Sequence, residues 1–82
     1  MRADMQIHEL KILPKYFEEV KCRIKNFELR KDDRGFMSGD LIVLREYENG
    51  KYTGRKLERY IKYILRDCPE YGLKEGYCIL GF

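Results

Sequence analysis

The stretch IKNFELRKDD, residues 24–33, decides which fold the sequence predicts. In an extended strand successive side chains point to opposite faces, so Glu28 and Arg30 share one face while Phe27 and Leu29 share the other. We expect the apolar pair to face the core of the domain. The charged pair would then stand on the opposite face, about 7 Å apart along the strand, where it could hold a ligand in a defined orientation.

The residues before this stretch predict a strand followed by a helix. Apolar and charged residues alternate over residues 8–13, which is typical of a half-buried strand. Pro14 suits the first turn of a helix, which we expect over residues 14–23. Glu18 and Glu19 come before Lys21 and Arg23, the order that the helix dipole favours. The expected helix carries one apolar stripe made of Leu13, Phe17, Val20 and Ile24.

The residues after the stretch predict further strands joined by turns. Residues 41–46 begin with apolar side chains on both faces, which predicts a central strand, and residues 48–50 predict a hairpin turn. Residues 52–55 either extend that loop or make a second bend. Residues 57–65 fit both a helix and a strand, and their aromatic and β-branched content favours a strand; residues 77–80 predict a short closing strand.

These elements predict one α+β domain over residues 1–82. About five to six strands with one N-terminal helix in 82 residues favour a small mixed β-barrel with the helix packed beside it. We expect a monomer or a weak homo-oligomer. The predicted core consists of Phe27, Leu29, Leu41, Val43, Ile61 and Ile79.

Composition excludes several classes of protein. No apolar run approaches the roughly 18 residues of a spanning helix, so we expect no membrane partner. The first ten residues lack the pattern of a secretory signal, and we expect a cytoplasmic protein. Three cysteines without C-x-x-C spacing argue against a disulfide framework and a zinc ribbon, and we expect neither a metal nor a cofactor.

Charge is unevenly distributed along the chain. The net charge is +3, but residues 21–34 carry six basic and three acidic side chains, and residues 51–66 carry six basic and one acidic. The rest of the chain is therefore acidic on balance. Two basic segments favour a polyanionic partner if they fold onto one face, whereas a solvated surface of mixed charge is the simpler interpretation.

Residues 23–30, RIKNFELR, resemble the motif G-x-K-x-x-E-x-R of the ASCH domain family within the PUA-like superfamily. The motif's Lys, Glu and Arg correspond to Lys25, Glu28 and Arg30. The segments HELKILPKYFEEV, LRKDDRGFMSGDLIVLREYE, YTGRKLERYIKYIL and YGLKEGYCILG are similar to small stand-alone bacterial and phage ASCH-like proteins, nearly from end to end. The resemblance implies a PUA-like β-barrel with a cleft beside the first helix and a role in RNA binding. For some relatives it implies hydrolysis of the amide in acetylated cytidine.

Arg23 stands where the family motif has glycine. If that glycine supplies a left-handed backbone at the end of the helix, Arg23 bears a strain of roughly 1–2 kcal/mol. If the glycine instead admits a ligand close to the backbone, Arg23 narrows the site or adds a phosphate contact of its own.

Each charged residue of the motif has a functional and a structural interpretation. Lys25, at the mouth of a cleft, is either a phosphate anchor or a solvated lysine. Glu28 and Arg30 either shape a ligand site or form a same-face ion pair that only organises the fold. Arg34 follows two aspartates, so it either contacts RNA or stabilises its own loop.

The histidine and the tyrosines have similar alternatives. His8 is the only histidine, and on an apolar face it is more often a satisfied core or cleft residue than a catalyst. Tyrosines lie in and beside the second basic segment, where exposed rings suit base stacking, although tyrosines that pack within barrels are commoner. Tyr47 and Tyr52 are the two that we select as candidates for stacking.

The principal prediction is RNA binding without strong sequence preference. The partner is single-stranded or structured RNA, or a nucleotide-like ligand, held in a cleft lined by Lys25, Glu28 and Arg30 and fed by the basic segment around Arg55. The alternative is an amide hydrolase that uses Lys25 and Glu28, although no serine or threonine lies within the motif. A third interpretation, a protein-interaction module, requires an exposed apolar patch of several hundred Å².

Overall fold

The computed structural model describes residues 4–82 and contains six strands, one α-helix and one 3-10 helix. In chain order the elements are β1 (Ile7–Ile12), α1 (Pro14–Lys21), β2 (Phe27–Lys31), β3 (Leu41–Glu48), β4 (Lys51–Tyr60), β5 (Tyr63–Leu65), η1 (Pro69–Tyr71) and β6 (Tyr77–Gly81). The predicted α+β class is confirmed. None of the helices among residues 4–82 has the length and apolar character needed to cross a membrane.

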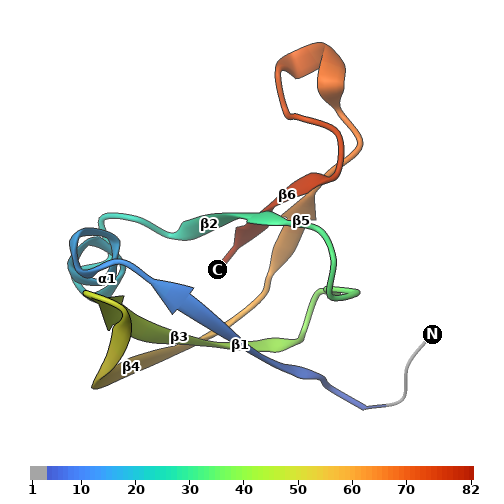
Figure 1. Cartoon of the computed structure of the whole chain (residues 1–82). Coiled ribbons are helices and arrows are strands. Elements are labelled where there is room, and N and C mark those ends of the chain that lie inside the picture. Colours follow the sequence, from blue (N-terminus) through green and yellow to red (C-terminus); the bar gives the residue numbers. More distant parts are fainter. Residues whose placement is uncertain (1–3) are drawn as a thin grey trace.

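The strands form two separate three-stranded sheets (Figure 1). Sheet A has the order β1-β3-β4, with β1 parallel to β3 and β4 antiparallel to it. Sheet B has the order β2-β6-β5 and is antiparallel throughout. Helix α1 lies at one end of the two sheets, and the segment between β5 and β6 projects away from them as an arm (Figure 1).

The hairpin between β3 and β4 shows why local sequence predicted this part of the fold well. Asn49 and Gly50 both have positive φ angles, 52° and 81°, which a two-residue hairpin turn of the favoured twist requires. Residues 52–55 do not extend the loop, because β4 is continuous from Lys51 to Tyr60. The alternative of a second bend agrees with the ladder: between the pairs Arg45–Lys56 and Tyr47–Tyr52, three residues of β4 lie opposite one residue of β3, and Gly54 among them has a φ of 97°.

The core lies between the two sheets and under α1. Its buried members come from both sheets, the helix and two connecting segments: Leu10, Ile12, Phe17, Val20, Phe36, Ile42, Leu44, Ile61, Cys78 and Leu80. The predicted burial of Leu41, Val43 and Ile61 is confirmed, whereas Ile79 is only half-buried. Within the expected helix stripe Phe17 and Val20 are buried; Leu13 and Ile24 are exposed because both lie outside the eight residues of α1.

The predicted orientation of β2 is wrong. Phe27 and Leu29 are 47% and 56% exposed, whereas Glu28 between them is only 5% exposed. The reason is the pairing with β6: Glu28 lies opposite Leu80 and Arg30 opposite Cys78, and both of these partners are fully buried. The charged side of β2 therefore faces inward, where Glu28 is compensated by Lys25 and Arg30, and the apolar side faces outward.

Candidate functional site

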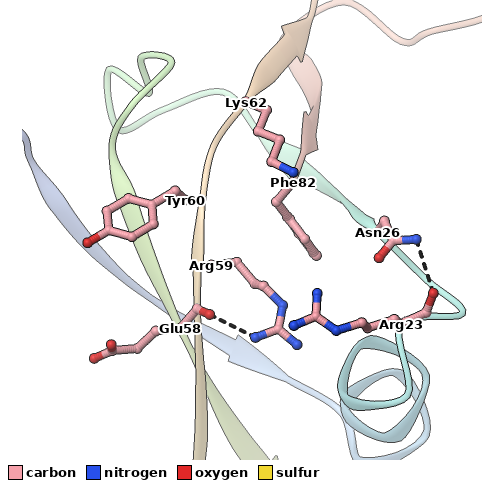
Figure 2. A pocket seen from close by; sticks show the side chains of 7 residues that line it. All are labelled: Arg23, Asn26, Glu58, Arg59, Tyr60, Lys62 and Phe82. Atoms are coloured by element: carbon pink, nitrogen blue, oxygen red, sulfur yellow. Dashed lines mark hydrogen bonds between the residues drawn. The ribbon is translucent and has the colours of Figure 1, made fainter.

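The two basic segments meet at a pocket of about 520 Å³ near the C-terminal end of α1 (Figure 2). Arg23 comes from the first segment, and Arg59 and Lys62 come from the second. The pocket is lined by Arg23, Asn26, Glu58, Arg59, Tyr60, Lys62 and Phe82. The two basic segments thus converge at this pocket, and they also meet where Arg66 pairs with Asp32.

Arg23 reaches the pocket because it terminates the helix in the left-handed conformation, with φ 62°. Its backbone N–H donates to the carbonyl oxygen of Val20 at 3.0 Å, and the N–H of Ile24 donates to the carbonyl oxygen of Glu19 at 3.0 Å. This pair of bonds is the Schellman ending, whose left-handed position is usually glycine. Arg23 has the left-handed backbone that the first interpretation of this position required, and a residue with a Cβ carries roughly 1–2 kcal/mol of strain there.

Arg59 is held by the same helix end. Its Nη2 donates to the carbonyl oxygen of Val20 at 3.2 Å, and its Nη1 donates to the carbonyl oxygen of Glu58 at 2.8 Å. A guanidinium has five N–H donors, so these two bonds orient Arg59 and leave donors for a ligand. Figure 2 shows the guanidinium groups of Arg23 and Arg59 pointing toward each other across the pocket.

The electrostatics of the pocket favour an anion. Within residues 4–82, no carboxylate forms an ion pair with Arg23, Arg59 or Lys62. Glu58 lines the pocket, but its carboxylate points away from the guanidinium groups (Figure 2). Two facing guanidinium groups repel each other, which costs free energy when no ligand is bound. An anion bound between them would remove this repulsion.

Polar and aromatic groups complete the lining. The side-chain amide of Asn26 donates to the carbonyl oxygen of Arg23 at 3.1 Å, which ties the start of β2 to the strained helix end. Phe82 contributes a ring beside Lys62, whereas the ring of Tyr60, at the end of β4, points away from the guanidinium groups (Figure 2). Cations next to rings are the combination that recognises a phosphate attached to a planar base.

The motif residues form a different cluster, which does not line this pocket. The ammonium of Lys25 contacts Oε1 of Glu28 directly and lies 5.1 Å from the ring centroid of Tyr16. Nη1 of Arg30 lies 3.9 Å from Oε2 of Glu28 and donates to the carbonyl oxygen of Lys11 at 3.0 Å. The sequence prediction was right that these three side chains meet, and their contacts tie β2 to the end of β1.

Arg55 is engaged by carboxylates. Its Nε and Nη2 donate to the two oxygens of Glu46 at 3.0 and 2.8 Å, and Nη2 also donates to Glu18 at 2.6 Å. The hydroxyl of Thr53 donates to Glu46 at 2.6 Å. Hydrogen bonds from Arg55 and Thr53 lower the pKa of the Glu46 carboxyl from 4.5 to about 2, and the same contacts raise the pKa of Arg55. Arg55 therefore connects α1 to sheet A.

The remaining predicted contact residues lie elsewhere. Nη1 of Arg34 donates to the carbonyl oxygen of Glu9 at 2.7 Å, so it ties its loop to β1. The rings of Tyr47 and Tyr52 pack edge to face at 5.1 Å, and the guanidinium of Arg45 lies 3.8 Å from the centroid of Tyr52. Both tyrosines lie at the hairpin end of sheet A.

His8 is a satisfied core residue. Its Nε2 lies 2.9 Å from Oδ2 of Asp40, both residues are buried, and its ring packs edge to face on Phe36 at 4.7 Å. Asp40 also accepts the backbone N–H of Gln6 and of Met37, at 3.1 and 3.0 Å. The pair therefore connects the start of β1 to the turn before β3.

Comparison with known proteins places the chain in a family. Residues 7–82 match the family model described as domain of unknown function DUF3850. The chain belongs to the DUF3850 family. It is also similar to a protein of Escherichia phage P2 described as "Uncharacterized 12.9 kDa protein in GpA 3'region", with 45% identity over 56 residues, or 68% of this chain. The DUF3850 chain matches about half the length of that relative, 51%.

Sequence reasoning missed most of the residues that line the pocket. Asn26 occupies an unspecified position of the motif, Arg59, Lys62 and Phe82 lie outside it, and only the long-range pairing of strands brings the four together. The one sequence signal that pointed to them was the surplus of basic residues in the second segment. Arg23 was foreseen as a possible phosphate contact because it replaces the glycine of the motif.

Proposed function

We propose that this DUF3850 domain binds RNA through the basic pocket at the end of α1. The observation that carries the proposal is the convergence of Arg23, Arg59 and Lys62, which have no carboxylate partner within residues 4–82, around a pocket that also contains Phe82. Phosphate neutralisation would supply the affinity, and the planar groups favour unpaired bases over a closed duplex. Single-stranded RNA is the form that fits this combination best.

The proposal predicts how strongly the affinity for RNA depends on salt concentration. If the three cations neutralise about three phosphates of a single strand, the logarithm of the binding constant falls with the logarithm of salt concentration at a slope of roughly −2. The two arginines offer fork-shaped donors that match phosphate oxygens, and the lysine offers a point charge.

Two features support the likeness to the ASCH domain, and we propose on this basis that the two sheets are a PUA-like arrangement. Lys25, in the segment between α1 and β2, meets Glu28 and Arg30 of β2. Arg23, at the glycine position of the motif, adopts the backbone that glycine favours. Both features agree with a motif whose residues act together in the fold.

The test is a titration of labelled single-stranded RNA at several salt concentrations. We expect Arg59→Gln and Lys62→Gln each to weaken binding and to flatten the salt slope by about 0.7. Lys51→Gln is the matched control, because it removes one charge from the opposite end of the same strand, β4. An equal loss in Lys51→Gln would indicate diffuse attraction to the basic strand, and absence of binding at low salt would exclude the proposal.

Amide hydrolysis of an acylated nucleoside is the second candidate. The direct contact between Lys25 and Glu28 favours it, because such a pair can exchange a proton. We place it second because Glu28 is engaged by both Lys25 and Arg30, which suits an ion pair better than a general base. Incubation of the purified protein with acetylated cytidine tests it, and we expect no release of product.

A further inference from the structure

The outward face of sheet B is apolar and carries no acidic residue at the positions that the strand registers define. These outward positions are Phe27, Leu29, Lys31, Tyr63, Leu65, Tyr77, Ile79 and Gly81. Tyr63 is 67% exposed, and Phe27 and Leu29 are exposed as described above. Such a face on a small domain is a contact surface for another molecule.

One row of this face has a position without a side chain between two aromatic residues, and we call this position the slot. Gly81 in the central strand lies opposite Phe27 on one side and Tyr63 on the other. Neighbouring strands are about 5 Å apart, so the backbones that carry the two aromatic residues are about 10 Å apart, with no side chain on the glycine between them. A ring inserted there would lie about 5 Å from each neighbour, within the range in which aromatic rings attract.

The slot lies at the same end of sheet B as the basic pocket. Three pocket residues are the immediate chain neighbours of the three residues in the row: Asn26 precedes Phe27, Lys62 precedes Tyr63, and Phe82 follows Gly81. Backbone hydrogen bonds fix the pocket residues relative to the row. The N–H of Lys62 donates to the carbonyl oxygen of Gly81 at 2.7 Å, and the N–H of Phe82 donates to the carbonyl oxygen of Asn26 at 3.0 Å. Because successive strand residues point to opposite faces and Phe82 packs against the core, the pocket and the slot lie on opposite faces at the same end of sheet B. An RNA strand that leaves the pocket reaches the slot by turning around this end of the sheet.

We infer that a base of the RNA held in the pocket stacks between Phe27 and Tyr63, above Gly81. The inference rests on the proposed function and adds the base-binding part of the site. Charge complementarity selects RNA as the occupant: the register positions of this face hold one cation, Lys31, and no acid, and the cations of the pocket lie at the same end of the sheet. A base supplies the ring, and phosphates of the same strand reach the cations of the pocket.

The test compares variants that lose a ring with variants that keep one. Phe27→Leu and Tyr63→Leu preserve apolar bulk but remove the ring, and we expect each to weaken binding of a labelled single-stranded RNA by about 5- to 100-fold. Tyr63→Phe keeps the ring and should bind within about twofold of wild type. Tyr71→Leu is the matched control: Tyr71 is 87% exposed in η1, outside the sheet, and the change should leave affinity unaltered.

The salt slope separates this inference from the proposed function. Leucine variants should lower affinity at every salt concentration without changing the slope, because the rings carry no charge. Unchanged affinity in both leucine variants, together with flattened slopes in Arg59→Gln and Lys62→Gln, would overturn the slot and leave the pocket standing. Sedimentation of the same proteins tests a protein contact instead: a wild-type oligomer that Tyr63→Leu dissociates, with RNA affinity unchanged, would also overturn the slot.

Discussion

Arg23 and Arg59 are joined through one acceptor, the carbonyl oxygen of Val20, which receives the backbone N–H of Arg23 at 3.0 Å and Nη2 of Arg59 at 3.2 Å. The bond that ends the helix and the bond that orients the second arginine therefore depend on the same atom. Because Arg23 must adopt a left-handed backbone there, the pocket is built on a strained residue.

Replacing Arg23 by glycine should raise stability and lower binding. Arg23→Gly removes the unfavourable Cβ at φ 62°, and we expect a gain of about 1 kcal/mol in the free energy of unfolding in urea. It also removes one cation, so the salt slope for RNA should flatten by about 0.7.

Arg23→Ala is the matched control for this experiment. Alanine loses the charge and keeps the Cβ, so it should lose as much affinity as Arg23→Gly without the gain in stability. Equal stability of the glycine and alanine variants would show that the backbone strain contributes nothing.

The buried carboxylate of Glu46 should make the free energy of unfolding decrease at low pH. Its pKa is lowered from 4.5 to about 2 in the folded protein, so its contribution is complete above about pH 4.5 and is lost as pH falls toward 2. Urea midpoints of the wild type should drop through this window. In Glu46→Gln the midpoint should be lower at neutral pH, and the difference from wild type should shrink in acid.

Glu18→Gln is the comparison variant, since it removes the exposed carboxylate that shares Arg55. We expect it to retain most of the acid dependence of the wild type. A Glu46→Gln variant whose acid dependence matched that of the wild type would contradict the assignment of this loss to Glu46.

Two phenylalanines should differ sharply in their contribution to stability. Phe17 is buried beneath the guanidinium of Arg55, 4.3 Å from its ring centroid, and Phe17→Ala should cost about 3–5 kcal/mol. Phe27 is exposed, and Phe27→Ala should cost less than about 1 kcal/mol. Urea unfolding measures both changes. A loss of several kcal/mol in Phe27→Ala would instead indicate that Phe27 faces the core, as the sequence first suggested.

Lys25 should matter for stability more than for the salt slope. Its ammonium is neutralised by Glu28, so Lys25→Ala leaves a buried carboxylate with Arg30 alone and should destabilise the protein by about 1–3 kcal/mol. The salt slope for RNA should change by much less than the 0.7 expected for a lost phosphate contact. A full flattening would instead identify Lys25 as a phosphate anchor, as the motif alone suggested.

The sequence predicted those parts of the fold that depend only on residues close together in the chain. Pro14 begins the helix, and the turn at Asn49 and Gly50 closes the hairpin. The first residues of β3 are buried on both faces of the sheet, which indicates that β3 is the central strand. The orientation of β2 could not be obtained in this way. Its alternation was recognised, but the side that faces the core depends on Leu80 and Cys78, which lie about fifty residues further along the chain.

The candidate site was predictable only in part, for a related reason. Arg23 and the basic segments are visible in the sequence, whereas the meeting of Asn26, Lys62 and Phe82 depends on strand order in sheet B. Burying a charge is normally costly, so a glutamate between two apolar residues favours the opposite orientation. Only the contacts of Glu28 with Lys25 and Arg30 explain why this chain departs from that rule.

The position of β6 at the centre of sheet B has a consequence for the order of folding. β2 and β5 pair with β6 and not with each other, so neither has a ladder partner until residues 77–81 are in place. The hairpin of β3 and β4 needs only residues 41–60, so its contacts are local and can form first. Sheet A can therefore form before the slot and the pocket exist, and both of these depend on the later docking of β6.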